Sequence, residues 1–408
     1  MLKKTLVLLS LLFVFSCNKS EIIFPQEEEN TEPLAECVNG FAGIYPCNGY
    51  DLIAFLSLAD LDPTNSTNIS GNDSWGWTDP TNQKEYALMG LNTGISIIDI
   101  SNSTQPIVVG FLPTATVNNS FRDVKVYNNF AFVVSEAADH GMQVLDLTKL
   151  RDITNPPEIL SADTTFNGFG SAHNIVINES KGYAYPVGTT RSGTYKGGPL
   201  FINIQDPLNP VDEGGFLNYS HDAQVVTYNG PDTEHNGKEI LIGSNETEIV
   251  IVDVSDKSNP LELSSISYSN VEYTHQGWFT EDMNYFLLGD ELDEVTNGGN
   301  TRTIIFDFSD LDNPTLSSEY YGPTAAIDHN GYIKGNTYFL ANYTAGFRAI
   351  DISNIETGSL VETGYFDTFP SGNSASYDGV WNVYPYFESG NIIISDIDSG
   401  LFIVKKSE

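Results

Sequence analysis

The sequence predicts an all-β fold, a seven-bladed β-propeller, and two observations support this prediction. One hairpin, an apolar strand followed by a polar turn and a β-branched strand, recurs seven times along the chain. Its period of about 50 residues is that of a propeller blade. Each repeat has room for four short strands, separated by Gly, Asn, Asp and Pro turns and by no amphipathic helix of useful length.

Each hairpin in turn supplies the second and third strand of one predicted blade. The seven hairpins begin at Ala87, Ala131, Ala184, Ile240, Phe286, Phe339 and Ile393. Most of them end in Asp, and the anchor positions are Asp99, Asp146, Asn203, Asp253, Asp307, Asp351 and, by alignment, Lys405.

After most anchors the chain continues into a short strand with a proline at or near its start, as at Pro106, Pro260 and Pro314. Proline suits an outer strand, where a missing N–H costs no ladder bond. The seventh anchor has no such successor, and "YDLIAFLSL" from Tyr50 has the pattern needed to fill that edge. We therefore expect one domain over residues 37–408, closed by the N-terminal strand pairing into the last blade.

The first residues have the character of a targeting segment. Lys3 and Lys4 precede an apolar run too short to span a bilayer comfortably, and Ser16 precedes Cys17. This pattern predicts a bacterial lipoprotein signal at residues 1–16 and lipidation of Cys17, with an ordinary secretory signal as the alternative. Residues 17–36 are polar and acidic, as in a flexible tether. The membrane would then be a partner through the lipid, in the bacterial cell envelope and at its outer membrane.

Cys37 and Cys47 are the two cysteines that remain, in "CVNGFAGIYPC". An exported protein with two such cysteines most simply pairs them in a disulfide. A metal site with two cysteine ligands is the competing interpretation, but no His or further Cys lies nearby in the sequence.

The charge of the chain excludes one class of partner. Lys and Arg total 18 against 54 Asp and Glu, a formal net charge of -36. A field of this sign repels phosphate backbones, so nucleic acid is not expected as a partner. The excess also suits an acidic surface adapted to a salty habitat.

Unusual polar residues stand at the start of the strand that opens each blade, where apolar or small residues are expected. They are Arg122 with Asp123, His173 with Asn174, His221 with Asp222, His275 with Gln276, Asp328 with His329 and Asn330, and Asp378. The first strand of a blade lines the central channel, so these positions converge on one axis. Because side chains alternate along a strand, one residue of each adjacent pair faces inward. The histidines are our choice, since imidazole recurs in four blades.

Three chemical interpretations of this polar ring remain open. His173, His221, His275 and His329 could bind a divalent transition metal, with Asp and Asn neighbours orienting the rings. The ring could instead bind a small polar ligand, with Trp278 facing it. Alternatively, the polar residues could only hydrogen-bond one blade to the next.

Two further groups of residues carry weaker expectations. The acidic turn of Asp290, Glu291, Asp293 and Glu294 could hold calcium, but it lacks the spacing of an EF-hand loop, so a solvated run of charges is the stronger interpretation. His140 and His235 stand in turn-like stretches and are expected to be exposed.

Several motifs together resemble one known family. They include "CVNGFAGIYPCNGYDLIAFLSLADL", "HGMQVLDLTKLR", "HDAQVVTYNGPD", "YTHQGWFTED" and "DHNGYIKG". On these the chain resembles the choice-of-anchor B family of bacterial cell-envelope proteins, which are built from LVIVD-type propeller repeats. Phe121 stands where the family pattern has Trp, and "GFRAID" is looser than the family's "GLRVLD". The resemblance implies the fold and the location, with Cys17 as the anchor, and implies no catalytic residues.

Two function classes follow. "GxSxG", "HExxH", "CxxC" and a glycine-rich phosphate loop are absent from the sequence, which disfavours serine hydrolases, zincins and nucleotide enzymes. The leading hypothesis is a lipid-anchored binding or scaffold module, whose ligand is a small polar molecule or an envelope protein. The alternative is a metal-dependent lyase or hydrolase that uses the channel histidines, an analogy of fold alone.

Overall fold

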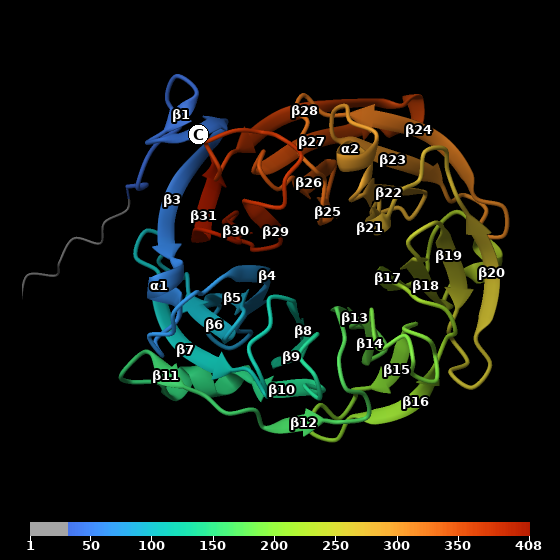
Figure 1. Ribbon diagram of the computed structural model, residues 1–408, viewed down its shortest axis with the longest axis horizontal. Coiled ribbons are helices and arrows are strands. Elements are labelled where there is room, and N and C mark those ends of the chain that lie inside the picture. Colours follow the sequence, from blue (N-terminus) through green and yellow to red (C-terminus); the bar gives the residue numbers. More distant parts are fainter. Residues whose placement is uncertain (1–31) are drawn as a thin grey trace, which may run out of the picture. The chain divides into compact units, whose positions relative to one another are not determined.

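The computed structural model describes residues 32–408 and places seven β-sheets in a ring (Figure 1). The predicted signal segment, Cys17 and most of the predicted tether lie outside the described residues. Each innermost strand contacts the innermost strand of the next blade, and β29 returns to β4 to complete the circle. The predicted seven-bladed propeller is confirmed.

The first three blades follow the chain in order from the centre outwards. Blade 1 contains β4 (Gly71–Thr78), β5 (Glu85–Leu91), β6 (Gly94–Asp99), β7 (Ile107–Pro113) and the parallel edge strand β11 (Glu158–Ile159). Blade 2 contains β8 (Arg122–Tyr127), β9 (Phe130–Ser135), β10 (Met142–Asp146) and β12 (Thr164–Phe166). Blade 3 contains β13 (Asn174–Asn178), β14 (Tyr183–Val187), β15 (Leu200–Asn203) and β16 (Val211–Gly215).

The next three blades repeat the same order. Blade 4 contains β17 (Asp222–Thr227), β18 (Glu239–Ser244), β19 (Ile249–Asp253) and β20 (Leu261–Ile266). Blade 5 contains β21 (Thr274–Phe279), β22 (Tyr285–Asp290), β23 (Arg302–Asp307) and β24 (Thr315–Tyr321). Blade 6 contains β25 (Gly331–Lys334), β26 (Thr337–Ala341), β27 (Phe347–Asn354) and β28 (Ser359–Phe366), and the hairpin of β1 (Phe41–Ala42) and β2 (Tyr45–Asn48) extends its outer edge.

The last blade joins both ends of the described chain. It contains β29 (Val380–Tyr384), β30 (Ile392–Asp396), β31 (Gly400–Lys406) and, as outer strand, β3 (Tyr50–Ser57). Tyr50 lies opposite Lys406 in this antiparallel pairing. The predicted closure by the N-terminal strand is therefore confirmed. Ahead of the predicted boundary at Cys37, the backbone N–H groups of Leu34 and Ala35 already bond to carbonyl oxygens of β3.

Helical structure is short and sits in connections. The α-helices are α1 (Leu58–Leu61) and α2 (Asp293–Thr296), and the 3₁₀ turns are η1 (Leu147–Asp152), η2 (Thr233–His235) and η3 (Ile355–Thr357). Within residues 32–408 no helix is long and apolar enough to cross a membrane.

The anchor residues at the ends of the hairpins have a local structural role. The side-chain oxygen of Asp99 accepts a hydrogen bond from the backbone N–H of Ser101, and Asp253 and Asp307 bond in the same way to the residue two positions on. This Asx turn reverses the chain from the third strand of a blade to its outer strand. It explains why Asp or Asn recurs at that position.

The hydrophobic core lies between neighbouring blades. In the cluster between blades 4 and 5, for example, Ile242 and Ile251 pack with Phe286 and Phe306, and all four are fully buried. Each blade covers its neighbour with the large β-branched and aromatic residues of its middle strands, so the ring has no isolated sheet face.

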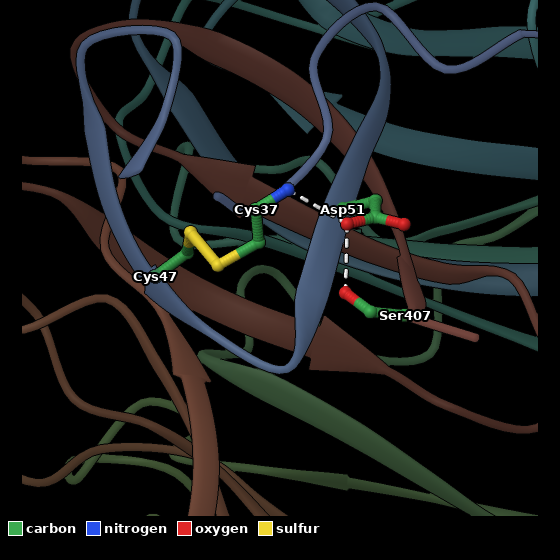
Figure 2. Close-up of a disulfide and its surroundings, with 4 residues drawn as sticks. All are labelled: Cys37, Cys47, Asp51 and Ser407. Carbon is green, nitrogen blue, oxygen red and sulfur yellow. Dashed lines mark hydrogen bonds between the residues drawn. A yellow bond between two sulfur atoms is a disulfide. The ribbon is translucent and has the colours of Figure 1, made fainter. Parts of the chain in front are cut away.

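The predicted disulfide between Cys37 and Cys47 is present and closes the β1–β2 hairpin (Figure 2). Beside it, the carboxylate of Asp51 accepts hydrogen bonds from the backbone N–H of Cys37 at 2.8 Å and from the hydroxyl of Ser407 at 2.7 Å. One β3 side chain thus connects the start of the disulfide hairpin with the segment that follows β31.

Replacing both Cys37 and Cys47 by serine is expected to lower the free energy of unfolding by about 2 to 3 kcal/mol, because the crosslink restricts a short loop of the unfolded chain. Denaturant titration of the variant and the wild type would measure the difference. Two freely alkylated thiols in the intact wild-type protein would contradict the prediction.

Candidate functional site

The four predicted histidines lie side by side at one end of the central channel. His173 and His221 directly precede β13 and β17, His275 lies in β21, and His329 stands two residues before β25. The ring centroids are 4.3 Å apart for His173 and His221, and 4.5 Å apart for the pairs His221–His275 and His275–His329. Four consecutive blades therefore contribute one imidazole each to a continuous row.

This row lines a cavity of about 500 Å³. Two carboxylates, Glu136 and Glu291, also line it. Much of the remaining wall is aromatic: Phe121, Tyr219, Tyr273, Tyr343, Tyr377 and Trp381. The cavity combines metal-ligating groups with flat apolar surfaces that could hold a small organic molecule.

Hydrogen bonds on the far side of three imidazoles fix their orientation. Nδ1 of His329 donates to the carbonyl oxygen of Trp381 at 2.6 Å, and Nδ1 of His173 lies 2.7 Å from a carboxylate oxygen of Glu136. Nδ1 of His221 lies 2.9 Å from the hydroxyl of Tyr273. Where Nδ1 donates to an oxygen that can only accept, as in His329, Nε2 keeps its lone pair free.

Burial favours the neutral form of His221, His275 and His329. It lowers the pKa of His221 and His275 well below the usual value, helped by the neighbouring histidines, and it lowers the pKa of His329 to about 3. Nε2 of His221 is buried and makes no hydrogen bond within the described residues. These three histidines therefore offer unprotonated nitrogen atoms at neutral pH.

Glu291 is the functional candidate that sequence reasoning placed wrongly. Its carboxylate reaches from the turn after β22 into the cavity, with oxygens 3.6 Å from Nε2 of His275 and 3.7 Å from Nε2 of His329. Tyr343 donates a hydrogen bond to it at 2.8 Å, and burial raises its pKa to about 7. Ligand atoms of His221, His275 and Glu291 all lie within 4.8 Å of one another, which is a metal-sized group.

The second residue of two polar pairs links neighbouring blades instead of facing the cavity. Gln276 accepts a hydrogen bond from the backbone N–H of Gly331 at 2.9 Å and donates one to its carbonyl at 3.1 Å. Asp123 accepts from the N–H of Ile175 at 2.8 Å. Asp222, also buried, bonds to its own neighbour Ala223. Hydrogen bonding between blades thus accounts for Gln276 and Asp123, while His275, the neighbour of Gln276, lines the cavity.

The remaining predicted ligand residues do not line this cavity. The guanidinium of Arg122 is buried and bonds to the carbonyl of Leu91, to His140 and to Thr114. Asp328 is fully buried, and Asp378 bonds to Ser376. Trp278 packs on Tyr332 and lines a separate cavity of about 140 Å³. These residues lie apart from the cavity that the histidines line.

Two histidines predicted to be exposed are buried. His140 is 0% exposed because its ring packs against Arg122 and accepts a hydrogen bond from it. His235 is 4% exposed and lies between Lys238 and Asp312, at 3.0 Å from each. Arg122 is 18 residues from His140 and Asp312 is 77 residues from His235, so the local sequence does not reveal these two contacts.

The acidic turn is neither a solvated run of charges nor a set of converging calcium ligands. Asp290 is fully buried and accepts hydrogen bonds from the hydroxyl of Tyr268 and from the backbone N–H groups of residues 272 and 273. Asp293 bonds to Nε of Arg302, and Glu294 bonds to the N–H of Arg302. Glu291 turns into the cavity, so the four carboxylates contact different groups and do not converge on one point.

Glu294→Gln is expected to stabilise the protein increasingly as pH rises. Burial, followed by the charge of Asp293, raises the pKa of Glu294 to about 9. The folded state then retains a proton that the unfolded chain loses near its ordinary pKa, so wild-type stability falls between about pH 4.5 and pH 9 and is level above. Glutamine removes this loss. Denaturant titrations at pH 5, 7 and 9 would measure the growing difference, with exposed Glu262→Gln as control, and an offset independent of pH would contradict it.

Comparisons with known proteins agree with the fold. The LVIVD repeat model matches residues 84–114 and 240–267, so the chain contains LVIVD repeats, and both matches span the second to fourth strands of a blade. No curated protein shows significant similarity to the chain.

Solved structures are similar in fold at low sequence identity. The β-propeller domain of Cps50 (Swd1) from Myceliophteria thermophila has a TM-score of 0.53 at 9% identity, covering 84% of this chain and 100% of that one. A protein from Lactobacillus plantarum has a TM-score of 0.50 at 13% identity, covering 80% and 88%. The C-terminal WD40 domain of Sif2 has a TM-score of 0.50 at 11% identity, covering 85% and 84%.

Proposed function

We propose that this LVIVD-repeat propeller is a lipid-anchored binding module of the bacterial cell envelope, whose histidine-lined cavity holds a divalent transition metal and a small polar ligand beside it. The fold and the repeats favour a binding or scaffold module. The cavity supplies the chemistry of recognition, and the predicted lipid on Cys17 supplies the location.

One contact carries the metal proposal. The Nδ1 proton of His329 is committed to the carbonyl of Trp381, so its Nε2 is an acceptor, yet the group it faces at 3.7 Å is the carboxylate of Glu291. Two acceptors in a buried site repel each other unless a proton or a cation lies between them, and 3.7 Å is too long for a hydrogen bond in which the two groups share a proton. Ligand atoms that are each about 2.1 Å from one ion lie about 3 to 4 Å apart, which matches this separation.

The donor set favours a transition metal over calcium or magnesium. Imidazole nitrogens with one carboxylate suit zinc, iron, nickel, copper and manganese better than the harder cations, which prefer oxygen ligands. His221, His275 and Glu291 would form the centre of the site, with His329 and His173 beside it. The aromatic wall leaves room for a ligand next to the ion.

Elemental analysis of protein purified without an affinity tag tests this function. The expected result is about one transition-metal ion per chain, lost in Glu291→Gln and kept in Glu262→Gln, an exposed glutamate on β20. After chelation, adding zinc or manganese back is expected to raise the melting temperature of the wild type. The metal proposal would be overturned if the wild type is metal-free and its melting temperature does not change when transition metals are added.

The envelope anchor has its own test. Mass spectrometry of the native protein is expected to show an acyl mass on an N-terminal Cys17, and Cys17→Ser is expected to release the protein from membranes. Unchanged membrane retention of that variant would refute the anchor, whatever the state of the cavity.

A metal-dependent lyase or hydrolase is the second candidate. It is favoured by Glu136, which lines the cavity, bonds to His173 and is partly exposed, so that it could move a proton to or from a bound substrate. Turnover of a polar substrate that is lost in both Glu136→Gln and Glu291→Gln would favour the enzyme over the binding module.

A further inference from the structure

The disulfide hairpin has an unusual surface. Residues 37–50 contain no Asp, Glu, Lys or Arg, in a chain whose formal net charge is -36. Large apolar side chains are nevertheless exposed along the hairpin and the residues that lead into it: Leu34 by 64%, Val38 by 56%, Phe41 by 54% and Ile44 by 69%. We name these four residues the apolar hairpin surface.

The hairpin is held firmly while this surface stays outside. Ala42 and Cys47 are buried against blade 6, and β2 pairs with β28. Val38 and Phe41 are bridge partners, and Ile44 occupies the turn between β1 and β2. Figure 1 shows the β1 hairpin projecting from the outer side of the ring. Exposed apolar patches mark interaction sites, and this disulfide-closed loop displays such a patch on a fixed backbone.

Basic residues stand next to the hairpin. Lys405 and Lys406 are exposed and pair with Asp51 and Tyr50 on β3, directly after the hairpin. The backbone N–H of Ser407 bonds to the carbonyl of Gly49 at the base of the hairpin. Two of the chain's 18 basic residues are thus placed beside its uncharged projection.

The position of the hairpin along the chain identifies the occupant. Only about 15 residues separate Cys17 from the start of the described domain, a segment that can span at most about 50 Å. A lipid on Cys17 would therefore keep the hairpin within reach of the bilayer. The transfer of apolar side chains from water to the acyl boundary lowers the free energy, and lysines are attracted to lipid phosphates. The rest of the ring is acidic and has no electrostatic attraction to lipid phosphates.

We propose that the apolar hairpin surface inserts into the interface of the membrane that carries the lipid anchor, with Lys405 and Lys406 at the headgroups. The inference rests on the anchor in the proposed function and adds a second, protein-made contact. This contact would fix the orientation of the ring relative to the bilayer. The mouth of the cavity would then keep one orientation to the membrane, which a flexible tether alone would not impose.

Tryptophan fluorescence in vesicles tests this contact. The variant Phe41→Trp, in the full acylated protein, is bound to phosphatidylcholine vesicles with brominated acyl chains. The emission of the new tryptophan is the emission of the variant minus that of the wild type. We expect the vesicles to quench at least about half of it, because bromine quenches indoles in the acyl region. Leu261→Trp is the matched control: Leu261 is 57% exposed on the outer strand of blade 4, and its added emission is expected to remain unquenched. Val38→Trp replaces Phe41→Trp if the latter fails to fold.

Flotation of the wild type with the same vesicles separates the two proposals. If the wild type floats and Phe41→Trp is unquenched, the hairpin proposal is wrong while the anchor stands, which is also the outcome expected if a protein partner covers the surface. If the wild type does not float, the anchor is wrong and the hairpin proposal falls with it. Equal quenching of Phe41→Trp and Leu261→Trp also overturns the proposal.

Discussion

Replacing His275 by alanine is expected to weaken the binding of a divalent transition metal by about 10 to 100-fold, with a change in the free energy of unfolding of no more than about 1 kcal/mol. His275 is the central member of the row, 4.5 Å from the rings on either side, and its Nε2 faces Glu291. Its Nδ1 makes no hydrogen bond to another blade within the part of the chain that the structure describes. Its loss would therefore remove a proposed metal ligand and leave in place the hydrogen bonds through which Gln276 links blades 5 and 6.

Metal titration of chelated protein, followed by calorimetry, would measure this change. His140→Gln is the control, because His140 is also buried but lies outside the cavity, and glutamine can still accept the hydrogen bond from Arg122. Metal affinity in that variant is expected to equal that of the wild type. A loss of several kcal/mol of stability in His275→Ala with unchanged metal affinity would show that the row is structural.

Replacing the next residue, Gln276, by alanine is expected to have the opposite effect, a loss of about 4 kcal/mol of stability with little change in metal affinity. Gln276 is buried and satisfies both the N–H and the carbonyl of Gly331, across the boundary between blades 5 and 6. Alanine leaves two buried backbone groups unpaired, each at a cost of about 1 to 3 kcal/mol.

Denaturant unfolding of Gln276→Ala and of Gln105→Ala would test this expectation. Gln105 is exposed, so its replacement is expected to change stability by less than about 0.5 kcal/mol. Equal stabilities for the two variants would mean that solvent replaces the lost bonds and that the interblade link is dispensable. A large drop in metal affinity in Gln276→Ala would instead place Gln276 in the function of the cavity.

The fold was predictable because each blade repeats the same local signals. The same period of about 50 residues separates the anchor Asp residues, the prolines of the outer strands and the apolar hairpins. Because the last blade lacked an outer strand of its own, the segment from Tyr50 could be identified as the strand that completes it. The four histidines were predictable for the same reason: they share one position in the repeat, and a ring brings equal positions to one axis.

The rest of the site depends on contacts that the repeat does not encode. Alternation requires one residue of the pair His275–Gln276 to face inward, but it is equally satisfied by either. Glu291 looks like its neighbours Asp290 and Asp293 in sequence, and only the path of the turn after β22 sends it toward the histidines. Arg122 was expected beside the ligand because of its charge, but its guanidinium bonds to neutral groups and does not line the cavity.

Ring closure has a consequence for how the protein is made. The hydroxyl of Ser407 bonds to Asp51 across a sequence separation of 356 residues, and β3 has β31 as its partner in blade 7. The ribosome produces β3 before the inner strands of blades 1 to 6 and β31 after them, so β3 lacks its partner in blade 7 until those six blades have been synthesised. Contacts of such long range slow folding. An exported chain would therefore emerge from the translocation channel with an open strand edge, and chaperone protection matters most during that interval.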